Sequence, residues 1–207
     1  SLMLGKSGVS DITVFDAENM AVKFSASIKD FDAEKYFDLK EQRKLDLFMQ
    51  YGMAAGIDAV NDSMLNDADL DTERVGIAIG SGIGGLPSIE TTHNTYLKSG
   101  PRRISPFFIP ATIINMISGN LSIKYGYKGP NLSIVTACTT GTHNIGEGFR
   151  QIQYSHADVM ICGGAEMATT PLGIGGFAAA RALSTRNDEP QKASRPWDTE
   201  RDGFVLG

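Results

Sequence analysis

The fold is most readily inferred from Leu132-Ser133-Ile134-Val135-Thr136-Ala137-Cys138-Thr139-Thr140-Gly141. Residues 132–137 form a short apolar run rich in β-branched residues, which predicts a buried strand. Residues 139–153 predict a helix. Cys138 stands at the turn between them, where a side chain projects from the end of a sheet.

The same order of strand and helix recurs along the chain. Residues 75–79 and 158–162 are short apolar runs flanked by Gly, and they predict two more buried strands. Helices are predicted over residues 39–66, 86–98 and 111–125. Further predictions are a strand or extended loop over residues 12–15, a polar loop over residues 181–202 and the start of a strand at residues 204–206. Strands alternating with helices indicate an α/β fold.

Gly52 and Gly56 lie four residues apart in the first long helix, on its apolar face. Because glycine has no Cβ, this spacing predicts that another backbone approaches closely there.

Cys138 has two interpretations. At the start of a helix the first N–H groups are unpaired and the helix dipole is positive, so a thiolate is favoured and the residue fits a nucleophile elbow. A free cysteine is also commonly a buried structural residue. Cys162 lies within an apolar strand next to Gly163-Gly164, and the structural interpretation is preferred for it.

The chain has three histidines, and none is a convincing base for Cys138. His143 follows Cys138 by five residues, which places it about 140° away around a helix axis. His93 and His156 lie in polar surroundings and are expected to be solvated. No spacing of Cys and His predicts a metal site.

The turn Gly80-Ser81-Gly82-Ile83-Gly84-Gly85 matches G-x-G-x-x-G after a strand. A dinucleotide site also requires an acidic residue about 20 positions further on. Ser99-Gly100-Pro101 stands there instead, so close backbone packing or a pocket wall is the preferred interpretation.

Composition excludes several classes of protein. The 207 residues are 42% hydrophobic and 21% charged, which is typical of a globular domain. The net charge of −5 argues against a broad nucleic-acid-binding face. Two cysteines are too few for a disulfide framework, which favours a reducing cytoplasm. No apolar run is long enough for a membrane span, and the first residues do not form a signal peptide.

Basic residues nevertheless occur in islands: Lys40, Arg43 and Lys44 at the start of the first long helix, the pair Arg102 and Arg103, and Arg181. Such islands suit an acidic partner, or they are solvated surface charges. Phe107 and Phe108 on a loop fit an interface, a pocket lining or core anchors.

Several motifs together resemble the β-ketoacyl-acyl-carrier-protein synthases, in particular the elongating synthases II of bacterial fatty-acid synthesis. The motifs are Thr136-Ala137-Cys138-Thr139-Thr140-Gly141, Gly163-Gly164-Ala165-Glu166, Pro171-Leu172-Gly173-Ile174-Gly175-Gly176-Phe177, Ser194-Arg195-Pro196-Trp197-Asp198 and Arg201-Asp202-Gly203-Phe204-Val205-Leu206-Gly207. The resemblance runs from about Gly5 to Gly207.

The resemblance implies a thiolase-like αβαβα sandwich, a homodimer and a decarboxylative Claisen condensation. Cys138 matches the nucleophile that holds the acyl chain, and its N–H matches one donor of the oxyanion hole. Ile83 and Phe177 match acyl-pocket residues, and Phe108 matches a residue that reaches the partner subunit's pocket. Acyl carrier protein is the implied partner, meeting the rim formed by Lys40, Arg43, Lys44, Arg102, Arg103 and Arg181. No cofactor and no metal are implied, because the substrates arrive on the carrier's phosphopantetheine arm.

The resemblance also implies that residues 1–207 are the N-terminal half of a synthase, without its first strand and its C-terminal half. The family's catalytic histidines, its catalytic lysine and the second oxyanion donor belong to that C-terminal half, so this chain alone is not expected to complete the condensation. Two alternatives remain: a non-catalytic half that binds carrier protein or dimerises, and a thiolase-class acyltransferase that uses coenzyme A.

Overall fold

The computed structural model describes residues 2–207, which divide into two compact units. Residues 32–166 form one unit, here called the sheet unit. Residues up to Phe31 join Met167–Gly207 in the other, here called the two-segment unit. Within the described residues, no helix is long and apolar enough to cross a membrane.

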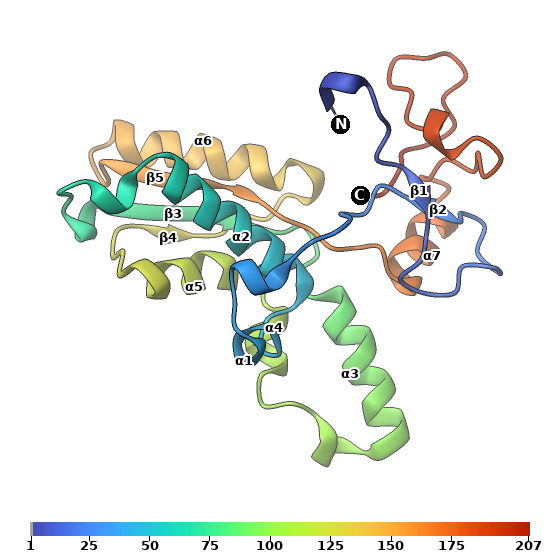
Figure 1. The fold of residues 1–207 in the computed structure, drawn as a ribbon, viewed down its shortest axis with the longest axis horizontal. Coiled ribbons are helices and arrows are strands. Elements are labelled where there is room, and N and C mark those ends of the chain that lie inside the picture. Colours follow the sequence, from blue (N-terminus) through green and yellow to red (C-terminus); the bar gives the residue numbers. More distant parts are fainter. Residues whose placement is uncertain (1) are drawn as a thin grey trace. The chain divides into compact units, whose positions relative to one another are not determined.

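The sheet unit is built on three parallel strands (Figure 1). The central strand is β3, Val75–Gly80, which lies between β4, Asn131–Leu132, and β5, Val159–Gly164. All residues of β3 are buried, as its apolar sequence predicts. The register pairs Ala78 with Leu132 and with Cys162, so the three strands run in step toward the same edge.

The predicted strand over residues 132–137 is wrong beyond Leu132, because side chains replace the neighbouring strand. The Asn144 amide accepts a hydrogen bond from Ile134 N at 3.1 Å and donates one to Ile134 O at 2.8 Å. The Thr140 hydroxyl accepts from Thr136 N at 2.9 Å. Both side chains belong to helix α6, Thr140–Gln153, and both are buried. The extended backbone is therefore held by the helix that follows it.

Helices cover both faces of this sheet (Figure 1). Helix α6 packs on β3 and β5, while α5, Met116–Tyr125, packs on β3 from the opposite face. Helix α2, Leu47–Asp62, packs against α5. A Cβ at Gly52 or at Gly56 would lie 2.6 Å from a side-chain carbon of α5, Ile117 Cδ1 or Leu121 Cδ1. The prediction of a close approach at Gly52 and Gly56 is confirmed, but side chains of α5 approach there and not a backbone.

Two predicted helices are interrupted. The predicted helix over residues 39–66 consists of α1, Leu39–Gln42, and α2, because Asp38 and Asp46 each cap a new helix start with a side-chain oxygen. The predicted helix over residues 111–125 divides into α4, Phe108–Thr112, and α5. The prediction over residues 86–98 is confirmed by α3, Leu86–Ser99. Short 3-10 turns of this unit are Ala33–Lys35, Leu65–Asp67, Thr72–Arg74, Pro101–Arg103 and Ala137–Thr139.

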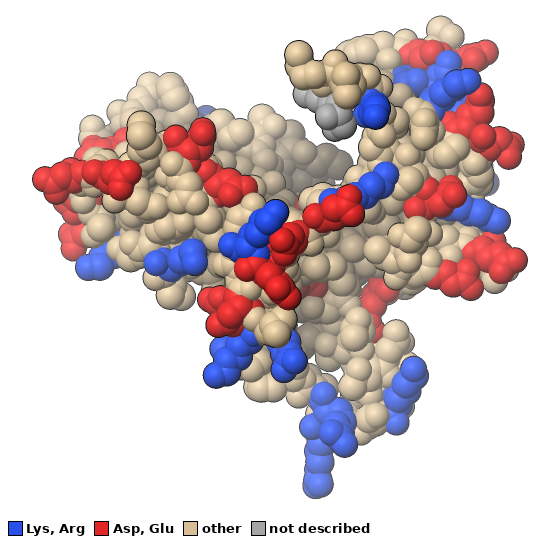
Figure 2. Space-filling model, viewed as in Figure 1, with Lys and Arg blue, Asp and Glu red and all other residues tan. Residues whose placement is uncertain are grey.

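Basic side chains gather at the C-terminal end of α3 and in the turn that follows it, at the bottom of Figure 2. Lys98, Arg102 and Arg103 are exposed there. A helix C-terminus carries a partial negative charge, which favours cations at this place.

The two-segment unit contains less regular structure. Strands β1, Ser10–Asp11, and β2, Phe24–Ser25, pair antiparallel, and the helix α7 covers Pro171–Ala179. The unit's 3-10 turns are Leu2–Leu4 and Pro190–Lys192. Its core is made by Val9, Val22, Phe24, Ile174, Leu183 and Ala193. The predicted strand at residues 204–206 is reduced to one bridge, between Leu183 and Phe204, and residues 12–15 form no strand.

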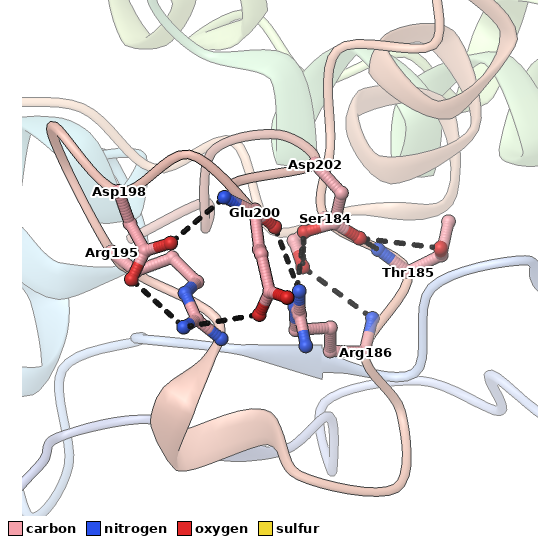
Figure 3. Close-up of polar contacts among 7 residues, drawn as sticks. All are labelled: Ser184, Thr185, Arg186, Arg195, Asp198, Glu200 and Asp202. Carbon is pink, nitrogen blue, oxygen red and sulfur yellow. Dashed lines mark hydrogen bonds and ion pairs between the residues drawn. The ribbon is translucent and has the colours of Figure 1, made fainter.

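Charged and hydroxyl side chains hold the loop over residues 184–202 (Figure 3). The Asp202 carboxylate accepts hydrogen bonds from Ser184 Oγ at 2.7 Å and Thr185 N at 3.0 Å, and it lies 3.5 Å from Arg186 Nε. Arg195 Nη2 pairs with Asp198 at 2.8 Å in the same loop. These contacts explain why the segment keeps a defined path although it has almost no regular structure.

The hydrogen bond from Ser184 lowers the pKa of Asp202, with smaller contributions from the Thr185 N–H and Arg186. An unfolded aspartate has a pKa of about 3.9. Since the pKa is lower in the folded chain, ionised Asp202 stabilises the fold above about pH 4. That contribution is lost as the pH falls through the lowered pKa.

Asp202→Asn is therefore expected to lower the melting temperature at pH 7 by roughly 2–4 °C, the effect of about 1 kcal/mol in a chain of this size. The difference from wild type should shrink as the pH falls below about 4 and vanish below the lowered pKa, where the carboxylate of the folded chain is protonated too. Thermal melts at both pH values measure this. Asp188→Asn is the control, because Asp188 is exposed and forms no ion pair in the described residues. A deficit of equal size at both pH values would contradict the role given to the charge.

Candidate active site

Three segments meet at the carboxyl edge of the parallel sheet. The glycine-rich loop Gly80–Gly85 follows β3, the turn Ala137–Thr139 follows the β4 segment, and Ala165-Glu166 follows β5. Ala165 N donates to Gly80 O at 3.0 Å, which ties two of them together. Ligands of open parallel sheets bind outside this edge, so a binding site is expected here.

Cys138 lies on a strained turn at this edge. The preceding residue, Ala137, has φ +53°, in the left-handed region that residues other than Gly rarely adopt. Thr136 O accepts from Thr139 N at 3.2 Å and from Thr139 Oγ1 at 2.9 Å, which closes the turn around Cys138. Cys138 itself is exposed. A strained turn that presents an exposed cysteine fits the nucleophile elbow and not the buried structural cysteine.

The backbone at this turn can bind a negative charge. Within residues 2–207, the N–H of Cys138 has no hydrogen-bond acceptor, and no side chain caps the start of α6. Free N–H groups at a helix start stabilise an oxyanion that forms on a substrate beside the sulfur.

The histidines are occupied or remote. His143 Nδ1 lies 2.6 Å from Thr136 Oγ1, and His156 Nδ1 lies 3.1 Å from Gln151 Oε1. His93 is exposed on α3. None of the three is hydrogen-bonded to Cys138, as the sequence predicts.

Cys162 differs from Cys138 in its surroundings. It lies half-buried on β5 beneath α6, where a Cβ added to Gly148 would overlap its sulfur. Burial raises the pKa of its thiol. This environment is that of an unreactive structural cysteine.

The glycine-rich loop binds a carboxylate of the chain itself. Glu166 Oε2 accepts from Ile83 N at 2.9 Å, and Oε1 accepts from Ser81 Oγ at 2.7 Å and from Gly84 N at 3.3 Å. The loop N–H groups that would cradle a phosphate are therefore already occupied by an anion. This supports the pocket-wall interpretation, and Ile83 is 39% exposed on that wall.

Phe108 lies at the start of α4 and lines a groove of about 260 Å³ with Phe107, Pro87 and Arg43. Lys44 Nζ stands 5.1 Å from the centre of the Phe107 ring, a cation–π contact. The groove therefore joins two aromatic rings to one of the predicted basic islands.

The remaining predicted residues are surface groups or belong to the two-segment unit. Lys40, Arg43, Lys44, Arg102 and Arg103 are exposed on the sheet unit. Phe177 and Arg181 belong to the two-segment unit. There Phe177 packs edge-on against Phe204, with ring centres 5.2 Å apart, and Arg181 is exposed at φ +55°. The structure thus brings the Ile83 loop to the Cys138 turn within one unit.

Sequence reasoning missed the roles of Asn144 and Glu166. Thr140, Asn144 and Gly148 recur every four residues on α6, and this polar or small stripe faces the sheet. A helix usually turns its apolar face toward the sheet. The opposite pattern in α6 could have identified Asn144 as a buried residue that bonds the neighbouring backbone. Glu166 stands two residues after the glycine pair Gly163-Gly164, but its place at the glycine-rich loop depends on the pairing of β5 with β3, which the sequence does not show.

Comparison with known proteins agrees with this geometry. The sequence profile described as "Beta-ketoacyl synthase, N-terminal domain" matches residues 1–207. The chain is 59% identical over 207 residues to 3-oxoacyl-[acyl-carrier-protein] synthase 2 of Vibrio cholerae, and 61% identical to the protein of the same name from Coxiella burnetii. It spans about half the length of these curated relatives, 50% in each case.

Solved structures show the same relationship. A β-ketoacyl synthase from Burkholderia phymatum superposes with a TM-score of 0.86 at 27% identity, over 99% of this chain and 50% of that one. The ketosynthase in the AntDE:AntF complex, a type II PKS acyl-carrier protein bound to its ketosynthase, superposes with a TM-score of 0.70 at 30% identity, over 76% of this chain and 46% of that one.

The predicted fold class is confirmed by these matches, since the parallel sheet covered by helices is that of the N-terminal half of thiolase-like ketosynthases. The chain belongs to the β-ketoacyl synthase family, and residues 1–207 correspond to its N-terminal domain.

Proposed function

We propose that Cys138 is the acyl-accepting nucleophile of a β-ketoacyl-acyl-carrier-protein synthase that elongates fatty acids, as in the synthase 2 relatives. The observation that carries the proposal is the exposed Cys138 on the strained turn, with its own N–H free at the start of α6. The high identity to relatives of that name supports it.

In the first step, the Cys138 thiolate attacks the carbonyl carbon of an acyl thioester on the carrier's phosphopantetheine arm. The carbonyl oxygen becomes an oxyanion, which the Cys138 N–H stabilises. The tetrahedral intermediate collapses, the pantetheine thiolate leaves and takes a proton, and the acyl chain remains on Cys138. No redox change and no further reactant are needed.

In the second step, malonyl-carrier protein loses CO2, and the resulting enolate attacks the thioester carbonyl on Cys138. A new carbon–carbon bond forms, the carbon–sulfur bond breaks, and Cys138 is released as a thiolate. No histidine of the described residues is hydrogen-bonded to Cys138, so we assign the groups that promote decarboxylation to the remainder of a longer protein. The length of the curated relatives supports that assignment.

Acyl carrier protein is the proposed partner. Arg43 lines the groove and Lys44 lies over the Phe107 ring, and Lys40, Arg102 and Arg103 are exposed on the same unit. A cationic rim of this kind suits a strongly acidic protein. Arg181 is proposed to extend the rim. Ile83 and Phe177 are proposed to line the acyl pocket, and Phe108 is proposed to reach the pocket of a second subunit in a homodimer.

Two free cysteines support a cytoplasmic location for the protein.

Residues 1–207 are proposed to act as one half of the synthase. Helix α6 turns its polar stripe toward the sheet and leaves an apolar stripe outside, with Ile145, Phe149 and Ile152 exposed by 58%, 65% and 46%. Exposed apolar stripes of this kind mark interaction surfaces. We propose that the C-terminal half covers it.

Intact mass spectrometry tests the first step. The protein is incubated with dodecanoyl-carrier protein, and we expect a gain of one acyl group because Cys138 alone presents an accessible thiol at the elbow. Cys138→Ser should abolish the gain, and Cys162→Ser should not. A gain retained in Cys138→Ser would contradict the proposal. Faster acylation by dodecanoyl-coenzyme A than by the carrier protein would favour the coenzyme A-dependent alternative.

The two cysteines should also differ toward a small reagent. Iodoacetamide at pH 7.5 is expected to label Cys138 at least about tenfold faster than Cys162, because Cys162 is half-buried and its pKa is raised. Peptide mapping after short exposure measures both rates. Equal rates would show that the elbow offers no advantage in access or reactivity.

A protein restricted to residues 1–207 should self-associate through the apolar stripe of α6. The double variant Ile145→Ser with Phe149→Ser is expected to be mainly monomeric by light scattering, because it removes two exposed apolar side chains. The control is Leu97→Ser, an exposed leucine on α3. A wild-type fragment that is monomeric and melts cooperatively would contradict the prediction.

A further inference from the structure

We propose that Glu166 is a positioning residue, whose carboxylate fixes the glycine-rich loop Gly80–Gly85, and with it Ile83, against the turn that carries Cys138. The proposal rests on the proposed function and deepens it. It states that Glu166 determines the shape of the pocket wall along which a long acyl chain lies. Glu166 is not assigned any contact with the reacting atoms.

The contacts of the Glu166 carboxylate all go to one short loop. Oε1 accepts from Ser81 Oγ at 2.7 Å and Gly84 N at 3.3 Å, and Oε2 accepts from Ile83 N at 2.9 Å. Ser81 Oγ in turn accepts from Gly84 N at 3.1 Å, so the loop and the carboxylate form a closed network. Ser81 is buried, which strengthens the need for its hydroxyl to be paired.

The loop touches the Cys138 turn at Gly82. A Cβ placed on Gly82 would lie 2.7 Å from Glu166 Oε2 and 3.3 Å from Ala137 O. The carboxylate, the loop and the residue before the nucleophile therefore meet at one point, and only a residue without a side chain fits between them. Because the Glu166 carboxylate is in direct contact with the loop, a shift of the carboxylate also shifts the loop.

The far side of the loop is anchored independently. Gly85 N donates to Thr112 O at 3.2 Å, and Gly84 lies at φ +86° beside Ile114. The end of the loop is thus fixed by the last residue of α4 and the chain that follows it, whereas the earlier part of the loop, with Ile83, depends on Glu166. Loss of the carboxylate should free Ile83 without unfolding the loop.

The change in the position of Ile83 should affect the transfer of a long acyl chain to Cys138 more than that of a short one. Ile83 is 39% exposed and follows Gly82, which meets the residue before Cys138, so the proposal places Ile83 along the path of a chain that extends past the sulfur. An acetyl group ends close to the sulfur and does not. The side chain of Glu166 therefore affects the selection of acyl length and leaves the reactivity of the Cys138 thiol unchanged.

The test compares Glu166→Gln with wild type in the whole protein as purified. Gln keeps the size of the side chain but can accept at only one of its two terminal atoms. The ratio of Cys138 acylation rates with dodecanoyl- and acetyl-carrier protein is expected to fall about tenfold, the factor that corresponds to one lost hydrogen bond to a charged group. The rate of Cys138 alkylation by iodoacetamide should stay within about twofold.

Two further variants approach the network from other sides. Gly82→Ala pushes a methyl group against the carboxylate and should reproduce the fall in the ratio. Glu147→Gln is the matched control, because Glu147 pairs with Gln151 and Arg150 on α6, and no hydrogen bond or ion pair in the described residues joins it to the loop. It should leave the ratio unchanged.

Amide hydrogen exchange keeps the test independent of acylation. In Glu166→Gln, the N–H groups of Ile83 and Gly84 are expected to exchange at least about tenfold faster. Unchanged exchange at both would overturn the positioning role, and faster exchange with an unchanged acylation ratio would overturn the role in acyl selection. Failure of the wild-type protein to accept any acyl group would overturn the proposed function, while exchange would still decide whether Glu166 fixes the loop.

Discussion

Parallel pairing of β3 with both neighbours is the constraint on which the site depends. The register that sets Gly80 opposite Gly164 ends two strands at the same level, and β4 pairs with the other side of β3 in the same direction. A turn after each strand must then emerge at one edge. The nucleophile, the glycine-rich loop and Glu166 meet there although they are far apart in the sequence.

Side chains complete what the backbone leaves unpaired at that edge. Asn144 substitutes for a neighbouring strand beside Ile134, and Glu166 substitutes for an external anion beside Ile83. In both cases a side-chain oxygen accepts a hydrogen bond from a backbone N–H, the part-buried one of Ile134 or the exposed one of Ile83. They also share a consequence, which is that the strained Cys138 turn lies between two fixed supports and its own N–H remains free.

The strands and helices with a strong apolar pattern were predictable from the sequence. The predictions for β3 and β5 are confirmed within a few residues, since each is a short apolar run flanked by glycine. Helices α3 and α6 are also confirmed, although α3 has no buried residue and α6 turns polar or small residues toward the sheet. The errors fall where polar side chains decide the backbone. Asp38 and Asp46 start new helices within an apparently continuous pattern, and Thr140 with Asn144 ends β4 early.

The candidate site was predictable in part, for the same reason. Cys138 stood out because a strand-to-helix turn defines its surroundings locally. The role of Glu166 depends on the register between two strands separated by a long stretch of sequence, which no local pattern reveals. The meeting of Ile83 with the Cys138 turn is likewise a property of the sheet order.

A crystal structure of the protein with a dodecanoyl chain bound would show which atom holds the chain and which wall the chain follows. We expect a thioester on Cys138 Sγ, with the carbonyl oxygen about 3 Å from the backbone nitrogen of Cys138. The chain should run along Ile83 while Glu166 still accepts from the loop. A chain attached elsewhere, or one on Cys138 that turns away from the glycine-rich loop, would contradict the account.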